Sequence, residues 1–258
     1  MALIHLDHVP ETVKVNLPLN IILPDPGKMG GLAVAKRKVL YLLHGLSDDA
    51  SAWQRYSSIE TVAAGYGLVV VMPSVGRSFY IDQPNGQKYF SYLTEELPQY
   101  LVDVFGLAPR REDTLIAGVS MGGYGAFKAA LLRPELYSAA ASFSGVLSLA
   151  ILQAMPDDPR RDEFAFLFGD LEKLAGSDHD PAVWLKRAAQ NPSLLPRLFI
   201  SCSRQEDLYP LSGMFHAACQ SLGVPAEYHE EDGGHDWFFW DGQIRRFLAA
   251  VLGPIPTQ

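Results

Sequence analysis

The segment 118–123, which reads GVSMGG, places a serine where its hydroxyl can act as a nucleophile. It follows a short apolar run at 114–117 and leads into a helical pattern at 121–132. In a strand–turn–helix context, a Gly-x-Ser-x-Gly sequence holds the serine on a sharp turn, close to the positive end of a helix dipole. We therefore predict that Ser120 is a catalytic nucleophile. The alternative is a glycine-rich strand exit with an ordinary helix-capping serine.

A serine hydroxyl is a weak nucleophile and needs a general base. His235 stands in the segment 232–237 (DGGHDW), after the last predicted strand at 226–229 and just before the last helix at 237–252. The base follows the nucleophile and the acid along the chain when the serine lies on this kind of turn. We predict that His235 is the base, and His229, within the final strand, is the weaker candidate.

The third group of such a triad is a carboxylate that accepts the other imidazole N–H. We expect it in the loop after the apolar run 198–201, where the segment 202–209 reads CSRQEDLY. This loop offers two adjacent acids, Glu206 and Asp207. Asp is the commoner residue in this role and Glu also serves, so the pattern leaves both open.

The tetrahedral intermediate of acyl transfer needs N–H groups that are already aimed at its oxyanion. One donor is expected to be the backbone N–H of Met121, directly after the nucleophile. The second is expected from the loop after the run 39–43, which begins His44-Gly45-Leu46. We assign it to the N–H of Leu46. Gly45 lets the backbone turn toward the substrate, and the His44 ring is taken as structural.

The elements that position these residues alternate between strands and helices. Runs that are apolar without alternation predict strands covered on both faces, at 39–43, 68–72, 114–117, 139–143 and 198–201. Helical patterns lie at 51–66, 89–105, 121–132, 211–222 and 237–252. This alternation predicts one α/β domain over 1–258, with a mostly parallel sheet and helices on both faces. Segments 2–9 and 13–23 are expected to form its antiparallel edge.

Residues 146–192 interrupt this rhythm. The segment is rich in Pro, Asp and Ala and holds two weak helical patterns at best. It follows a strand, which is where an α/β enzyme can carry a cap over its site. We expect a small cap insertion. A surface segment that does not cover the site is an equally supported alternative.

Composition narrows the classes of function. The chain has 258 residues, 21 Lys and Arg against 29 Asp and Glu, and a formal charge of −8. That balance argues against a nucleic-acid or anionic-membrane surface. We expect a cytoplasmic protein, because no apolar run is long enough to span a bilayer and the first ten residues lack the pattern of a signal peptide. Two cysteines are too few for a disulfide framework or a four-thiolate zinc site.

The order of motifs along the chain resembles one group of α/β-hydrolases, the esterase-D-type family. That group includes tributyrin and acetyl esterases, S-formylglutathione hydrolases, feruloyl esterases and mycolyltransferases. The resemblance covers nearly the whole chain. It is carried by the segments LLHGL (42–46), VVMPS (70–74), EELP (95–98), AGVSMGGYG (117–125), SFSG (142–145) and GHDW (234–237).

The resemblance implies an α/β-hydrolase fold and a serine carboxylesterase for acetyl to butyryl esters, without metal or organic cofactor. S-formylglutathione hydrolase and feruloyl or carbohydrate acetyl esterase are the alternatives. An inactive hydrolase fold that only binds is a further one. The resemblance leaves the oligomeric state open, although dimers and tetramers are common in the family; the charge balance given above argues against a nucleic-acid or membrane partner.

The resemblance also bears on single residues. It carries the roles of nucleophile and base to Ser120 and His235. For the acid, an ungapped register favours Glu206, whereas residue type favours Asp207, so both stay open. It further implies that Trp53 and Tyr80 approach the substrate pocket. Trp237, next to the base, is expected to line the cleft, with core packing as the alternative for all three aromatic residues.

Overall fold

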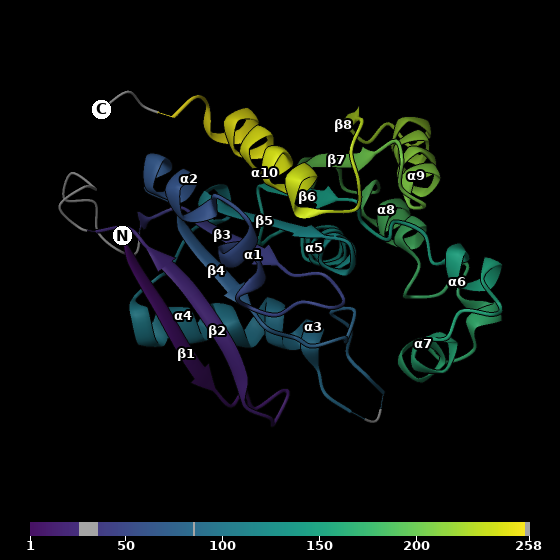
Figure 1. Ribbon diagram of the computed structural model, residues 1–258, viewed down its shortest axis with the longest axis horizontal. Helices are drawn as coiled ribbons and strands as arrows, with labels where there is room; N and C mark the ends of the chain where they lie inside the picture. The colour runs from purple at the N-terminus through teal and green to yellow at the C-terminus, as the bar shows by residue number, and fades with distance from the viewer. Residues whose placement is uncertain (26–35, 85, 256–258) are drawn as a thin grey trace.

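The computed structural model describes residues 1–25, 36–84 and 86–255, and within them the chain forms one eight-stranded sheet (Figure 1). The strand order is β1-β2-β4-β3-β5-β6-β7-β8. The strands are β1 (Ala2–His8), β2 (Leu17–Leu23), β3 (Val39–Leu43), β4 (Val69–Pro73), β5 (Thr114–Val119), β6 (Ala139–Phe143), β7 (Arg197–Ser203) and β8 (Ala226–Glu231). The pairs β1–β2 and β2–β4 are antiparallel and the others parallel. The predicted mostly parallel sheet with an antiparallel edge is confirmed.

Helices cover both faces of the sheet. They are α1 (Ala52–Tyr56), α2 (Ile59–Tyr66), α3 (Tyr89–Ser91), α4 (Leu97–Phe105), α5 (Met121–Leu132), α6 (Ala150–Ala154), α7 (Arg161–Phe168), α8 (Pro181–Ala188), α9 (Tyr209–Ser221) and α10 (Trp237–Leu252). One apolar core joins the sheet to α4, α5, α8 and α9, and the other joins it to α1, α2 and α10. None of the described helices is long and apolar enough to cross a membrane.

The inner strands show why their sequences lack alternation. Every residue of β3, β4, β5 and β6 is buried. Along β3, Tyr41 belongs to one core and its neighbour Leu40 to the other, as the period of two requires. A strand buried on both faces must therefore be apolar throughout. The outer strand β8 is half-exposed and correspondingly polar.

Two predicted helices are interrupted. The helix expected at 51–66 is split into α1 and α2, because the carboxylate of Asp241 accepts hydrogen bonds from Ser58 N and Ser58 Oγ, each at 2.7 Å. The helix expected at 89–105 contains a wider turn at Tyr92–Glu96, directly before Pro98. Proline has no amide hydrogen to donate to the preceding turn, which is a usual cause of such irregularity.

The insertion at 146–192 holds more helix than the sequence pattern predicts. It contains α6, α7 and α8, and α6 and α7 project beyond the end of the sheet, at the right of Figure 1. Its buried side chains are mainly apolar, among them Leu152, Phe164 and Phe168. Asp180 accepts a hydrogen bond from Ala182 N and begins α8, with Pro181 in the first turn. This Asp-Pro start was the readable helix signal in the segment.

Candidate active site

Ser120 lies on the turn between β5 and α5 in a conformation that few L-residues adopt. Its φ is 54° and its ψ is −118°. The turn is this tight because its glycines allow close backbone contact: a Cβ on Gly118 would lie 2.3 Å from Gly122 O, and a Cβ on Gly122 would lie 2.6 Å from Leu43 O. Only glycine fits at both positions, so β5, α5 and the end of β3 meet directly around the serine.

His235 is paired with Glu206. The Nδ1–H of His235 donates to Glu206 Oε2 at 2.5 Å, and the Glu206 side chain is 3% exposed. Asp207 is exposed and makes no hydrogen bond to the ring. Of the two acids that the sequence leaves open, the structure therefore pairs with the imidazole the one that the register favours, Glu206, and not the one that residue type favours, Asp207. His229, the weaker candidate for the base, bonds to Glu231 on the outer strand β8.

The second oxygen of Glu206 is occupied by other donors. Glu206 Oε1 accepts from Ser144 Oγ at 2.7 Å, Ser203 N at 2.7 Å and Cys202 Sγ at 3.0 Å. Burial alone would raise the pKa of Glu206, but these donors and His235 outweigh it, so the net effect is a pKa below the ordinary value. The carboxylate is therefore ionised at neutral pH, and Oε2 is left for the imidazole.

Two backbone N–H groups lie beside Ser120. Leu46 and Met121 line the same cavity as the serine, and neither amide has a hydrogen-bond partner in the described parts of the chain. These are the two donors that the sequence predicts for an oxyanion.

The loop that carries Leu46 is held by His44. Val75 N donates to His44 Nε2 at 3.1 Å, so the ring proton is on Nδ1, which donates to Gly45 O at 2.7 Å. Burial lowers the pKa of His44 to about 4, so the ring is neutral in this role. The prediction that His44 is structural agrees with these contacts.

Two aromatic residues expected in the substrate pocket lie behind this loop instead. Trp53 and Tyr80 are buried and do not line the cavity. Trp53 Nε1 donates to Leu43 O at 3.0 Å, and Tyr80 Oη donates to His44 O at 3.1 Å. Their polar groups thus bond to the carbonyls of Leu43, the last residue of β3, and His44, the first residue of the loop that carries Leu46. Both side chains support this loop from behind.

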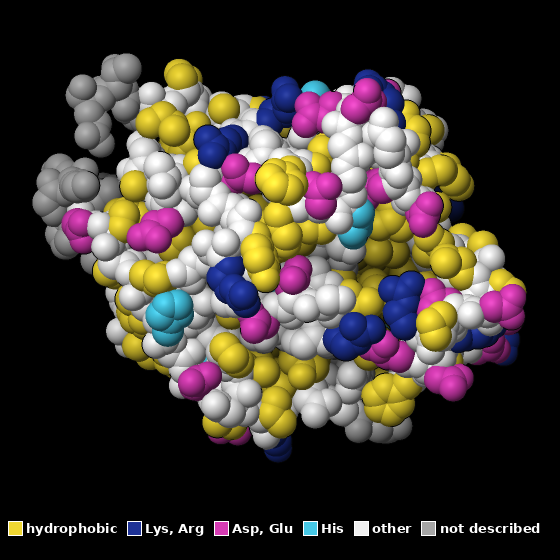
Figure 2. Space-filling view, viewed as in Figure 1, with side chains coloured by type: hydrophobic (Ala, Val, Ile, Leu, Met, Phe, Trp, Pro, Cys, Tyr) yellow, Lys and Arg dark blue, Asp and Glu magenta, His cyan; other side chains and the backbone are white. Residues whose placement is uncertain are grey.

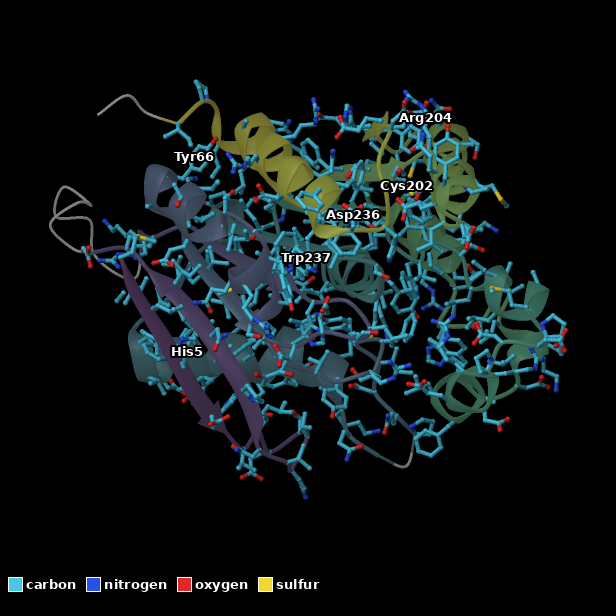
Figure 3. The ribbon with its side chains drawn as sticks, viewed as in Figure 1. His5, Tyr66, Cys202, Arg204, Asp236 and Trp237 are labelled. Carbon is cyan, nitrogen blue, oxygen red and sulfur yellow. The ribbon has the colours of Figure 1, made fainter. Side chains whose placement is uncertain are left out.

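Trp237 also departs from its expected place. It packs edge-on against Trp53, at 5.0 Å between ring centroids, and against Trp240, at 5.2 Å. It is not part of the cavity wall, whereas Gly45 and Trp240 are. In Figure 3, Asp236 and Trp237 lie at the start of α10, and Cys202 lies where β7 meets α9. Asp236 accepts hydrogen bonds from Phe238 N and Phe239 N and so begins this helix.

The cavity has a volume of about 450 Å³ and brings Ser120, His235 and the two amides to one wall. Its opposite lining comes from the insertion and is mostly apolar: Val146, Ile151, Leu152, Met155 and Phe164. Figure 2 shows a hollow with hydrophobic side chains inside and charged side chains at its edge. Arg160 lines it too, and its guanidinium bonds to both oxygens of Asp158, at 2.9 and 2.6 Å.

Three parts of this site were not predicted from the sequence. Ser144 stands within the segment SFSG (142–145) without an assigned role, and the sequence patterns point neither to Trp240 nor to the cavity residues of α6 and α7. Ser144 directly follows β6, at the edge of the sheet where the strands end and where α/β sites form. That position was the available signal for Ser144.

The comparisons with known proteins agree with this geometry. A model of the Esterase family matches residues 11–251. The chain belongs to the Esterase family. It is 30% identical to an acetyl esterase of Caldicellulosiruptor saccharolyticus, over 95% of this chain and 96% of that protein.

Two solved structures from Staphylococcus aureus are also similar to the chain. One is FphF, a fluorophosphonate-binding serine hydrolase, with 32% identity, a TM-score of 0.88 and coverage of 98% of this chain and 99% of that chain. The other is an S-formylglutathione hydrolase, with 32% identity, a TM-score of 0.87 and coverage of 97% and 98%. The family and the α/β-hydrolase fold expected from the motifs are therefore confirmed, as is a serine esterase of the carboxylesterase class.

Proposed function

We propose that the protein hydrolyses short-chain acyl esters, acetyl to butyryl, with Ser120 as nucleophile, His235 as base and Glu206 as acid. The observation that carries this assignment is the convergence on one cavity wall of the serine, the carboxylate-paired imidazole and two free amides. A nucleophile, a base with its carboxylate and two oxyanion donors are the groups that acyl transfer from an ester requires.

In this mechanism the Ser120 hydroxyl attacks the ester carbonyl and passes its proton to His235 Nε2. Leu46 N–H and Met121 N–H receive the oxyanion of the tetrahedral intermediate. Glu206 stays ionised and stabilises the imidazolium, which then protonates the leaving alcohol. Water, deprotonated by the same imidazole, attacks the acyl-enzyme and releases the acid and the free serine.

The size and charge of the cavity support small neutral esters. We propose that the segment 146–192 is a cap, because α6 and α7 supply the apolar lining opposite the serine. Arg160 is the one cationic residue of the lining within the described chain, and it is paired with Asp158. Asp48 and Asp207 add carboxylates to the lining. A glutathione thioester brings two carboxylates of its own, so we rank S-formylglutathione below acetyl and butyryl esters.

A rate panel over p-nitrophenyl acetate, butyrate and octanoate, a feruloyl ester and S-formylglutathione tests the proposal. We expect the highest kcat/KM with acetate or butyrate. Ser120→Ala is expected to lose on the order of 10⁶ in kcat. Equal rates for wild type and Ser120→Ala would contradict the assignment of Ser120 as nucleophile and would favour an inactive hydrolase fold that only binds. If kcat/KM were highest with S-formylglutathione or the feruloyl ester, the proposed substrate class would be wrong, whereas the proposed mechanism would still hold.

The cytoplasmic location and the dimer or tetramer stay predictions. Cell fractionation and analytical ultracentrifugation test them.

A further inference from the structure

The carboxylate of Glu206 has two oxygens with separate tasks. Oε2 faces His235, and Oε1 is held by three donors, of which the Ser144 hydroxyl is one. Ser144 is fully buried, and its N–H donates to Ser201 O at 2.7 Å. Its φ is 50°, a left-handed conformation that costs a non-glycine residue free energy. The fold therefore holds a strained serine directly behind the acid.

The direction of the Ser144 hydrogen bond is determined by Trp240. The indole Nε1–H of Trp240 donates to Ser144 Oγ at 3.0 Å. An indole can only donate, and an ionised carboxylate can only accept. The single hydroxyl proton of Ser144 must therefore point to Glu206 Oε1, at 2.7 Å. The relay from indole to hydroxyl to carboxylate has one orientation.

Trp240 contacts the base as well. Its ring lies edge-on to the His235 ring, with 4.9 Å between centroids and 86° between planes, and it lines the cavity. The same side chain thus fixes the imidazole by ring packing and the acid through a hydrogen bond. Trp240 lies in the first turn of α10, and His235 directly precedes Asp236, which caps the start of this helix.

We propose that Ser144 and Trp240 are positioning residues, which keep the Glu206 carboxylate ionised and aimed at His235 through the relay Trp240–Ser144–Glu206. This proposal rests on the proposed esterase function. It adds that the catalytic competence of His235 depends on a residue at the end of β6 and on the first turns of α10.

The other titratable groups near the pair are few. Cys202, at the end of β7, contacts Glu206 Oε1, and burial raises the pKa of its thiol, so it stays protonated. Asp207 is the neighbour on the same loop, and Asp236 is occupied with the amides at the start of α10. Asp48 lines the cavity on the oxyanion loop. Only Cys202 among these contacts the carboxylate, and it carries no charge that could replace the relay.

Removal of the Ser144 hydroxyl leaves Glu206 with one donor fewer, so its negative charge interacts more strongly with the imidazolium. We expect Ser144→Ala and Ser144→Gly to move the acid limb of the kcat/KM profile for p-nitrophenyl acetate to higher pH, by roughly half to one unit. We also expect kcat to fall about tenfold with little change in KM, because the carboxylate is no longer held in its position toward the imidazole. Ser144→Gly separates this effect from folding, because glycine relieves the left-handed strain while it also lacks the hydroxyl.

Trp240→Phe keeps an aromatic ring beside His235 and removes the indole N–H together with part of the ring volume, which the control below also loses. We expect a smaller shift in the same direction, and the double variant Ser144→Gly/Trp240→Phe to lose no more than the larger single loss, because both break one relay. Trp184→Phe is the matched control. Trp184 is equally buried and its Nε1 donates to Asp178 O at 2.8 Å, but it lies outside the cavity wall. It is expected to leave the pH profile in place.

An unmoved acid limb in Ser144→Gly, or losses that multiply in the double variant, would overturn the relay. Either result would mean that Ser144 and Trp240 act only through packing. The failure of the esterase proposal is a separate outcome, since it would show as wild-type activity in Ser120→Ala.

Discussion

The wall of the cavity that carries Ser120 and Gly45 is held by buried hydrogen bonds, whereas the wall formed by α6 and α7 is held by apolar contacts and surface ion pairs. Behind the first wall, the side chains of Trp53, Tyr80 and His44 all bond to backbone carbonyls at the end of β3 and in the loop that follows it. On the second wall, Phe164 packs on Phe79 at 5.9 Å between centroids. The geometry of the chemistry is therefore fixed by directional bonds, and the shape of the substrate pocket by contacts without strict direction.

This difference has a physical reason. Oxyanion donors and a triad must be placed to within a fraction of an ångström, and buried hydrogen bonds supply that precision because an unpaired partner is costly. Apolar packing tolerates substitution as long as volume is kept. In the cap that we propose, side chains can therefore vary, and with them the preferred ester, without disturbing the reacting groups.

Among changes to the first wall, Glu206→Gln is expected to lower kcat the most. The glutamine cannot stabilise the imidazolium or hold its tautomer in the same way, so we expect a loss on the order of 10⁴ in kcat. Asp207→Asn is the matched comparison, and we expect a far smaller loss because Asp207 makes no hydrogen bond to the ring. Steady-state rates with p-nitrophenyl acetate measure both. A larger loss in Asp207→Asn would reverse the assignment of the acid.

The buried His44 makes the first wall sensitive to acid. The pKa of His44 is lowered from 6.5 to about 4 in the folded protein, so between these values the unfolded chain binds more protons and stability falls as the pH falls. From pH 7.5 to pH 5 this contributes a loss of about 2 kcal/mol in the free energy of unfolding. Urea unfolding at the two pH values measures it.

The control for this loss is a variant without the imidazole. His44→Gln is expected to lose less stability over the same pH interval than wild type, because glutamine does not titrate. An identical pH dependence in His44→Gln and wild type would contradict the assignment of the effect to this residue.

The smallest effect is expected in the segment 146–192, which we propose as a cap. Arg77 and Glu163 form a two-point ion pair at 2.5 and 2.7 Å between the loop after β4 and α7, and both side chains are partly exposed. Such pairs contribute less than about 1 kcal/mol and weaken with salt. We expect Glu163→Gln to raise the octanoate-to-acetate ratio of kcat/KM a fewfold and to leave the acetate rate near wild type. The exposed pair Arg197–Glu227 supplies the control variant Glu227→Gln, in which the ratio should not change. If the acetate rate changed and the octanoate-to-acetate ratio did not, the Arg77–Glu163 pair would act on the reacting groups of the first wall and not on the shape of the pocket.

Much of the scaffold could be predicted from the sequence because its signals are local. The bounds of β3, β6, α5 and α10 agree with the predicted ranges, since a strand buried on both faces needs a continuous apolar run and these helices end at recognisable signals. The serine turn and its glycines were recognisable for the same reason. Short helices such as α6, with five residues, carry too few periods to be recognised.

The amino-acid sequence by itself determined where the inner strands lie along the chain, the turn that carries Ser120, and the place of His235 before the last helix. Tertiary structure decided which of two adjacent carboxylates meets that histidine, because the choice depends on the path of three residues after β7 and on Ser144 from another strand. It also decided that Trp53 and Tyr80 support the loop rather than line the cavity. A Trp or Tyr gives the same sequence signal whether it lines a cavity or supports a loop. Only its neighbours in space determine which carbonyl its polar group bonds to.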